Sequence, residues 1–239
     1  MNLKGKRILI VGATSDIGFD IAKLCKKRGA NVVATGRNTI RLSQLQKEGI
    51  DIVKLDLLNK EDVTNFVNSL PEFNGIVFSM GSVSFVPFIH EKSETIQEKV
   101  SIGFSAIASL LAQIHKLKRI KQNASIVFIS SINGVTVGSI GTSVYSATKA
   151  AITGLSKSLA LEMAVYGIRV NCICPGIIDT SQIHLNFSEE MIKRFSEDYP
   201  LKRIGTTDDV AKGAVFLLSD ESSWITGINL LIDGGYSAR

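Results

Sequence analysis

Tyr145 and Lys149 stand four residues apart within a stretch that we expect to be helical over 144–166. Residues at this spacing share one face of a helix. A phenol has a pKa of about 10, so a tyrosine that acts as a base at pH 7 needs its pKa lowered by ~3 units, or about 4 kcal/mol. We expect the ammonium group of Lys149 to supply part of this lowering. The pair therefore predicts proton transfer by Tyr145.

A second hydroxyl precedes this pair. Ser131 follows a run, Ser125–Ser130, that we predict to be a strand. From the end of that strand its hydroxyl would bond a substrate oxygen and polarise a carbonyl group. A tyrosine and a lysine at this spacing are frequent by chance, so the interpretation depends on the other motifs of the chain.

A glycine-containing turn follows the first predicted strand, Arg7–Val11, and leads into a predicted helix. Glycine lets the backbone approach a phosphate, and a helix N-terminus offers free N–H groups. The turn's place between the first strand and helix strengthens its interpretation as a dinucleotide site. An aspartate suits such a turn only if its side chain caps the helix and points away, so Asp16 weakens the prediction of a dinucleotide site without removing it. The predicted contacts are Gly12, Thr14, Ser15, Asp16, Ile17 and Gly18.

The second predicted strand, Asn31–Thr35, bears on the choice of dinucleotide. A site for NAD places an acid here for the ribose 2′-hydroxyl, whereas an arginine accommodates the 2′-phosphate of NADP. Gly36 stands in the acid's place and Arg37 follows it. A charge-assisted contact worth ~1.5–3 kcal/mol would favour NADP by roughly 10- to 150-fold. We predict NADP(H), with a solvated surface arginine as the alternative.

These motifs resemble those of the short-chain dehydrogenase/reductases, and the resemblance spans essentially the whole chain. It implies hydride transfer between NADP(H) and a carbonyl or secondary alcohol, with Ser131, Tyr145 and Lys149 as the catalytic residues. It is carried by 12–18, similar to TGxxxGIG, and by Ser130-Ser131, Tyr145–Lys149, Arg169–Thr180, Pro200–Gly205, Ile225–Gly227 and Asp233–Gly235.

The resemblance also implies further cofactor contacts. The side chain of Asp56 would meet the adenine, although an ordinary turn aspartate is the competing interpretation. The backbone near Ile178 would meet the carboxamide, and Thr180 would reach the phosphates. The remaining implied contacts are Leu57, Gly81, Tyr145, Lys149, Pro175 and Gly176.

The chain departs from the family pattern in several places. Val11 and Asp16 replace a threonine and the middle glycine of the turn, and the loop after the fourth strand lacks the family's asparagines. Thirteen residues separate Ser131 from Tyr145, where twelve is usual. Gly103 falls where the family commonly has an asparagine that holds a water of the proton relay. We expect a working but slower enzyme.

Short apolar runs alternate with helical patterns, which predicts parallel βαβ units. We expect a single domain over 1–239, a Rossmann-like doubly wound sheet of seven parallel strands with helices on both faces. The interruption at 181–200 predicts a short amphipathic helix that serves as a substrate lid, with a packing element as the alternative. The predicted strands are Arg7–Val11, Asn31–Thr35, Ile50–Lys54, Gly75–Ser79, Ser125–Ser130, Ile168–Cys174 and Asn229–Ile232, and the helices are 16–29, 39–48, 60–70, 93–121, 144–166 and 207–219.

Composition excludes several classes of function. The 239 residues are 45% hydrophobic, but the apolar runs are too short for a membrane span. The net charge is +5, and groups of basic residues stand at the C-terminal ends of predicted helices. Cations there interact favourably with the helix dipole, so no nucleic-acid partner is needed to explain them. Scattered histidines suggest no metal, and Cys25, Cys172 and Cys174 suggest packing. The N-terminus lacks a secretory pattern, so we expect a cytoplasmic protein.

Two other functions remain open. A catalytically weak or inactive NADP-binding regulatory or scaffold protein would explain Gly103, and a sugar-nucleotide epimerase or dehydratase uses a similar Tyr-Lys pair. We expect a homotetramer or homodimer. The substrate stays undetermined, although one group of residues suggests an apolar pocket if it is not core or subunit contact: Phe85, Val86, Phe88, Val135, Ile183, Leu185 and Phe187.

Overall fold

A computed structural model of the chain describes residues 1–81 and 83–238. Its centre is a seven-stranded parallel sheet in the order β3-β2-β1-β4-β5-β6-β7, which confirms the predicted doubly wound architecture. The direction of winding reverses between β1 and β4, and ligands bind at such a point, outside the carboxyl ends of the strands. The strands are β1 Arg7–Val11, β2 Asn31–Gly36, β3 Asp51–Lys54, β4 Phe73–Phe78, β5 Ile120–Ile129, β6 Arg169–Pro175 and β7 Asn229–Ile232.

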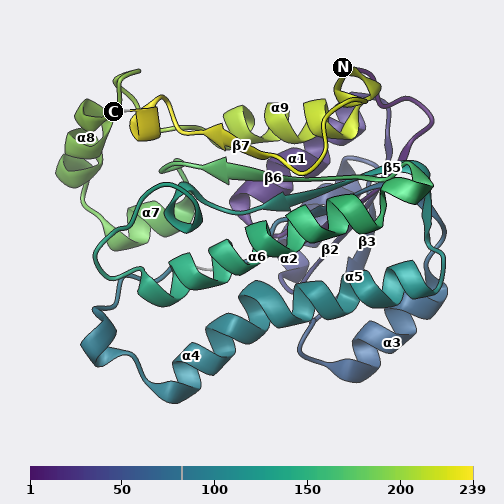
Figure 1. The fold of residues 1–239 in the computed structure, drawn as a ribbon, viewed down its shortest axis with the longest axis horizontal. Coiled ribbons are helices and arrows are strands. Elements are labelled where there is room, and N and C mark those ends of the chain that lie inside the picture. The colour runs from purple at the N-terminus through teal and green to yellow at the C-terminus, as the bar shows by residue number, and fades with distance from the viewer. Residues whose placement is uncertain (82, 239) are drawn as a thin grey trace.

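Helices cover both faces of the sheet (Figure 1). One face carries α1 (Asp16–Lys27), α2 (Thr39–Lys47) and α9 (Thr207–Leu218). The other carries α3 (Lys60–Ser69), α5 (Ala106–Lys116) and α6 (Ser143–Glu162). Helix α4 (Ser93–Val100) packs against α6. In the described ranges, 1–81 and 83–238, no helix is long and apolar enough to cross a membrane.

The core lies in two layers, one on each side of the sheet. Alternate residues of β1 enter different layers, Leu9 on the α5 side and Ile8 on the α1 side. This double burial explains why the strands are almost continuously apolar. Cys172 and Cys174 of β6 are fully buried, and burial raises the pKa of the Cys172 thiol to about 11, so the predicted packing role is confirmed.

The predicted helix over 93–121 is wrong in extent. Helix α4 passes through a π-helical turn, Ser101–Ser105, into α5, which ends at Lys116. Lys118 then takes a positive φ of 54°, which an α-helix cannot accommodate, and β5 begins at Ile120. Lys121 therefore belongs to a strand and not to a helix end.

The segment predicted as a single lid helix forms two helices, α7 (Ser181–Asn186) and α8 (Glu189–Asp198). They follow β6 at the carboxyl edge of the sheet (Figure 1). Phe187 between them packs edge-on against Phe85 and Phe195, with ring centroids 4.6 and 5.0 Å away. The predicted amphipathic segment thus lies over the ligand-binding edge and is held there by aromatic contacts.

Candidate active site

Tyr145 and Lys149 lie in the first two turns of α6 and share the face that the sequence predicts. Both line a cavity of about 540 Å³ at the carboxyl edge of the sheet. The Lys149 ammonium nitrogen lies 5.8 Å from the centre of the Tyr145 ring. The phenol and the ammonium therefore face one cavity.

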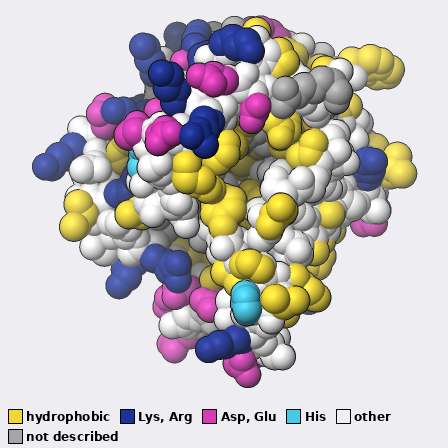
Figure 2. Space-filling view, turned by 90° about the vertical axis from the view of Figure 1, so that its left-hand side faces the viewer, with side chains coloured by type: hydrophobic (Ala, Val, Ile, Leu, Met, Phe, Trp, Pro, Cys, Tyr) yellow, Lys and Arg dark blue, Asp and Glu magenta, His cyan; other side chains and the backbone are white. Residues whose placement is uncertain are grey.

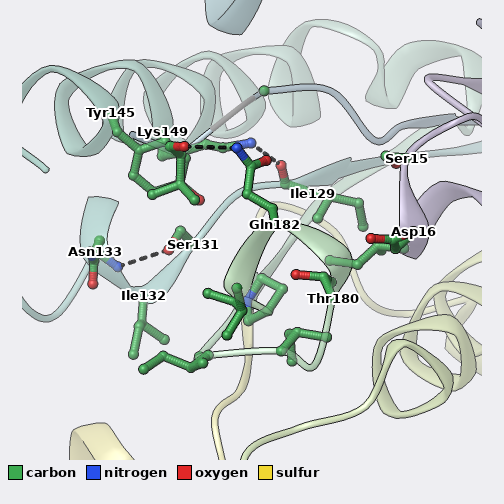
Figure 3. A pocket seen from close by; sticks show the side chains of 18 of the residues that line it. Ser15, Asp16, Ile129, Ser131, Ile132, Asn133, Tyr145, Lys149, Thr180 and Gln182 are labelled. Atoms are coloured by element: carbon green, nitrogen blue, oxygen red, sulfur yellow. Dashed lines mark hydrogen bonds between the residues drawn. The ribbon is translucent and has the colours of Figure 1, made fainter. Parts of the chain in front are cut away.

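Lys149 is anchored by the ends of two strands. Its Nζ donates hydrogen bonds of 2.8 Å to the carbonyl oxygens of Met80, after β4, and Ile129, at the end of β5 (Figure 3 shows the Ile129 bond). The hydroxyl of Ser130 donates to the carbonyl oxygen of Lys149, at 2.9 Å. The side chain is only 4% exposed, and burial lowers its pKa to about 8. The anchor thus holds an ammonium group that titrates close to neutral pH.

Ser131 lies two residues after the end of β5, beside Tyr145 (Figure 3). Its hydroxyl oxygen accepts a hydrogen bond from the backbone N–H of Asn133, at 3.2 Å. Burial raises the pKa of Tyr145, and a hydrogen bond with Ser131 opposes only part of this effect. The predicted lowering of this pKa by Lys149 is therefore not found in the protein alone. The phenol stays protonated and is suited to donate its proton.

The glycine turn packs tightly over the end of β4. Gly12 has a φ of 85°, and a Cβ there would lie 2.8 Å from the Met80 side chain. Ser15 caps helix α1, because its hydroxyl accepts a 3.0 Å bond from the Gly18 amide. The first amides of a helix have no partners within it, and those of α1 open toward the same cavity.

Asp16 does not cap α1, because Ser15 is the capping residue. Its carboxylate instead pairs with Arg41 of α2 and accepts two bonds from Ser181, the first residue of α7. Ser15 already occupies the capping position, so the side chain of Asp16 is free to reach across the cavity. Figure 3 shows Asp16 near Thr180, at the opposite end of the view from Tyr145.

The structure brings most of the predicted cofactor residues to the cavity and leaves others outside its lining. Gly12 and Gly18 lie within the turn and, like Arg37, Asp56 and Leu57, are not among the residues that line the cavity. The lining residues among the predicted contacts are Thr14, Ser15, Asp16, Ile17, Gly81, Tyr145, Lys149, Pro175, Gly176, Ile178 and Thr180.

The region of the predicted 2′-phosphate contact differs in detail from the sequence interpretation. Arg37 is exposed, whereas Arg41 lines the cavity. Helix α2 begins at Thr39, and its first turn brings Arg41 to the cavity. The predicted start of this helix at residue 39 could have pointed to Arg41. A Cβ on Gly36 would lie 2.9 Å from the Cβ of Thr14, so an acid does not fit there without displacing Thr14. Asp56 accepts a local 3.1 Å bond from the Leu58 amide, as an ordinary turn aspartate does.

One wall of the cavity is apolar. Phe85, Ile183 and Phe187 line it, and sequence reasoning missed Phe195 and Ile140. Ile140 is 95% exposed at the mouth, and Figure 2 shows hydrophobic side chains around the hollow on this face. Four residues named for the pocket from the sequence are not part of its lining: Val86, Phe88, Val135 and Leu185.

Gly103 is buried in the π-helical turn, against α6. A Cβ at this position would lie 3.2 Å from the side chain of Thr148, the neighbour of Lys149. Thr148 in turn donates a 2.7 Å bond to the carbonyl oxygen of Tyr145. The space beside Gly103 is therefore filled by a residue of the active-site helix, so a side chain at 103 would require Thr148 to move.

Comparison with known proteins agrees with this arrangement. Residues 12–237 match the family model described as Enoyl-(Acyl carrier protein) reductase. The chain is 33% identical over 240 residues to a 3-oxoacyl-(acyl-carrier-protein) reductase of Rickettsia felis, with 98% of each chain covered. It is 30% identical over 247 residues to dehydrogenase/reductase SDR family member 6 of Rattus norvegicus, again with 98% of each covered. A solved structure described as a short chain dehydrogenase/reductase family protein superposes with a TM-score of 0.89 at 30% identity, covering 99% of both chains. The chain thus belongs to the short-chain dehydrogenase/reductases, a family of oxidoreductases.

Proposed function

We propose that the protein is an NADP(H)-dependent oxidoreductase that interconverts a carbonyl compound and a secondary alcohol, with Tyr145 as the acid and base. The observation that carries the proposal is the convergence of Ser131, Tyr145 and Lys149 on one cavity that also receives the N-terminus of α1. A protonated phenol beside a second hydroxyl is the arrangement that carbonyl reduction requires.

The residues of the cavity fit a dinucleotide. The amides at the start of α1 suit a pyrophosphate, and Thr180 lies near Asp16, the first residue of that helix (Figure 3). Gly81 leaves room for Lys149, since a Cβ there would lie 2.9 Å from Nζ. The preference for the 2′-phosphate is supported by Arg41 in the lining and by Gly36, where no acid fits.

When bound in this cavity, NADPH would provide the hydride that the carbonyl carbon receives. The hydroxyl groups of Ser131 and Tyr145 bond the carbonyl oxygen and polarise it. Tyr145 then donates its proton to that oxygen, because burial keeps the phenol protonated until charge develops there. The Lys149 ammonium, held by two backbone carbonyls, stabilises the phenolate that remains.

The substrate proposal is a carbonyl compound with an apolar arm. Phe85, Ile183 and Phe187 offer an apolar wall, while Gln182 adds an amide to the lining. The Rickettsia felis relative is described as a 3-oxoacyl-(acyl-carrier-protein) reductase, so a 3-oxoacyl thioester heads the substrate panel. Small diketones, sugars and steroid-like ketones complete it.

The test is a panel assay that follows oxidation of NADPH and of NADH, with Tyr145→Phe as the matched variant. We expect turnover with NADPH to exceed turnover with NADH by at least tenfold, and the phenylalanine variant to lose roughly 10²–10⁴ of the rate. NADPH binding, followed by nucleotide fluorescence, should stay within a few-fold of wild type. Equal turnover by wild type and Tyr145→Phe would refute the role of Tyr145 as the proton donor.

We further propose that the protein acts in the cytoplasm as a homotetramer or homodimer. The support for an assembly is the resemblance to the family, which implies that the segments 93–121 and 144–166 form contacts between subunits. Light scattering in solution tests the assembly. A measured mass of one protomer, 25.9 kDa, would contradict it.

A further inference from the structure

The carboxylate of Asp16 joins three segments that are far apart in the sequence. One oxygen pairs with the guanidinium of Arg41, at the start of α2. The other accepts hydrogen bonds from the backbone N–H of Ser181 at 2.9 Å and from its hydroxyl at 2.6 Å. Asp16 stands at the start of α1 and Ser181 at the start of the lid, so the contact bridges the cavity.

These contacts are charge-assisted and only partly exposed to water. The side chains of Asp16 and Arg41 are 21% and 28% exposed. Burial acts to raise the pKa of Asp16, but the bonds from Ser181 and Arg41 outweigh it, and the pKa is lowered. The carboxylate is therefore ionised at neutral pH. Arg41 is also fixed from its other side, because its guanidinium lies 4.8 Å from the centre of the Phe19 ring.

Helix formation does not account for this aspartate. Ser15 already caps α1 through the Gly18 amide. Asp20, one turn further along α1, bonds Thr207 of α9 and has no part in the lid. Asp16 occupies the position that is the middle glycine in the family motif, so its side chain is an addition to a turn that works without one.

The link also determines what faces the cavity. Asp16, Arg41 and Ser181 all belong to its lining. Directly after Ser181 come Gln182, whose amide donates a 3.1 Å bond to the carbonyl oxygen of Val83, and Ile183 of the apolar wall. Fixing the first residue of α7 thus fixes the polar and apolar groups that the lid presents to the substrate.

We propose that Asp16 is a positioning residue that fastens the lid helix α7 to the dinucleotide turn, and that Arg41 neutralises its charge so that the cleft accepts an anionic cofactor. The first part concerns the protein alone. The second rests on the proposed function, because it assumes that phosphate groups of NADP(H) enter beside Asp16.

The first test is hydrogen exchange of the unliganded protein. In Asp16→Ala we expect the amides of 181–186 to exchange about tenfold faster, since loss of the acceptor frees the start of α7. Asp16→Asn should lie between this variant and wild type, because its carbonyl oxygen still accepts from Ser181. Asp20→Asn is the matched control on the same helix and should leave exchange of 181–186 unchanged.

A double variant separates the direct contact from general loosening. If Asp16 holds α7 through Ser181, the Ser181→Ala change should add little in the Asp16→Ala background, although it speeds exchange in the wild-type background. Exchange of 181–186 in Asp16→Ala at the wild-type rate would overturn the positioning role. This result needs no turnover, so it stands or fails independently of the proposed reaction.

The second test measures NADPH binding by fluorescence. Arg41→Met leaves the Asp16 carboxylate unpaired in the cleft, and we expect binding to weaken by about tenfold or more. Adding Asp16→Ala should restore much of this loss, because the repelling charge is gone. Equal binding by Arg41→Met and by the double variant would overturn the neutralising role. If wild type binds neither NADPH nor NADH, the proposed function and the neutralising role fail together, whereas the exchange result still decides the link.

Discussion

Lys149 gives the protein a stability that depends on pH in a definite direction. Its pKa is about 8 in the folded protein and about 10.5 in an unfolded chain, because folding buries the ammonium. Between these values the unfolded chain binds more protons than the folded one, so the free energy of unfolding rises with pH. From pH 7 to pH 9 the gain due to this residue is about 1.3 kcal/mol, out of about 3.4 kcal/mol for the whole shift.

The measurement is urea unfolding of wild type and Lys149→Met at pH 7, 8 and 9, at one protein concentration. Other groups, such as the buried thiols, titrate in both proteins, so the difference in unfolding free energy between them isolates Lys149. We expect that difference to change by about 1.3 kcal/mol in favour of wild type as the pH rises to 9. Carbonyl reduction by wild type should fall over the same range, because the ammonium that supports Tyr145 loses its proton. If the difference in unfolding free energy between wild type and Lys149→Met stays constant with pH, the lowered pKa of the buried Lys149 is refuted.

Three further outcomes are expected. Gly81→Ala should lower kcat at least tenfold and lower the free energy of unfolding by roughly 1–3 kcal/mol, because the new Cβ would lie 2.9 Å from Lys149 Nζ and residue 81 has a φ of 120°. Steady-state kinetics measures the first effect and urea unfolding the second. Wild-type values in both assays would contradict the packing described for Gly81. Gly36→Asp should not create a preference for NADH and should lower the free energy of unfolding by about 1–3 kcal/mol, unless Thr14 is also replaced by a smaller residue. A Gly36→Asp variant that prefers NADH and unfolds with the wild-type free energy would refute this expectation. His184 has a raised pKa, chiefly through a hydrogen bond to Asp179, which precedes α7. Its stabilisation of α7 is therefore complete below its ordinary pKa of about 6.5 and is lost as the pH rises through the folded value. Hydrogen exchange of 181–198, corrected for its intrinsic pH dependence, should therefore be faster at pH 8 than at pH 6, and His184→Gln should abolish this difference.

The sheet could be predicted from the sequence because each strand is short, apolar and followed by a recognisable turn. The bounds of β1 and β7 are those that the sequence predicts. The helix over 93–121 could not be bounded, since its local propensity continues past Lys116 and only the backbone at Lys118 ends it. Strong local patterns thus gave the elements, while their ends depended on single residues.

The shared placement of Tyr145 and Lys149 was predictable because the two residues are neighbours on one helix, and their relative position follows from the helical period. The residues that line the rest of the cavity were less predictable from the sequence. Arg37 follows β2, where the sequence predicts a contact to the 2′-phosphate, but the cavity is lined by Arg41 of α2, which no motif indicated. The partner of Asp16 is Ser181, 165 residues away, and no local pattern predicts such a contact.

The atoms that hold the Lys149 ammonium are main-chain oxygens, contributed by positions 80 and 129. No substitution at either position deletes a main-chain carbonyl, so these two residues can change during evolution while the hydrogen bonds to the ammonium are kept. Selection on this part of the molecule should therefore act on the path of the chain: an insertion or deletion beside either strand end would be far more damaging than an exchange of side chains there.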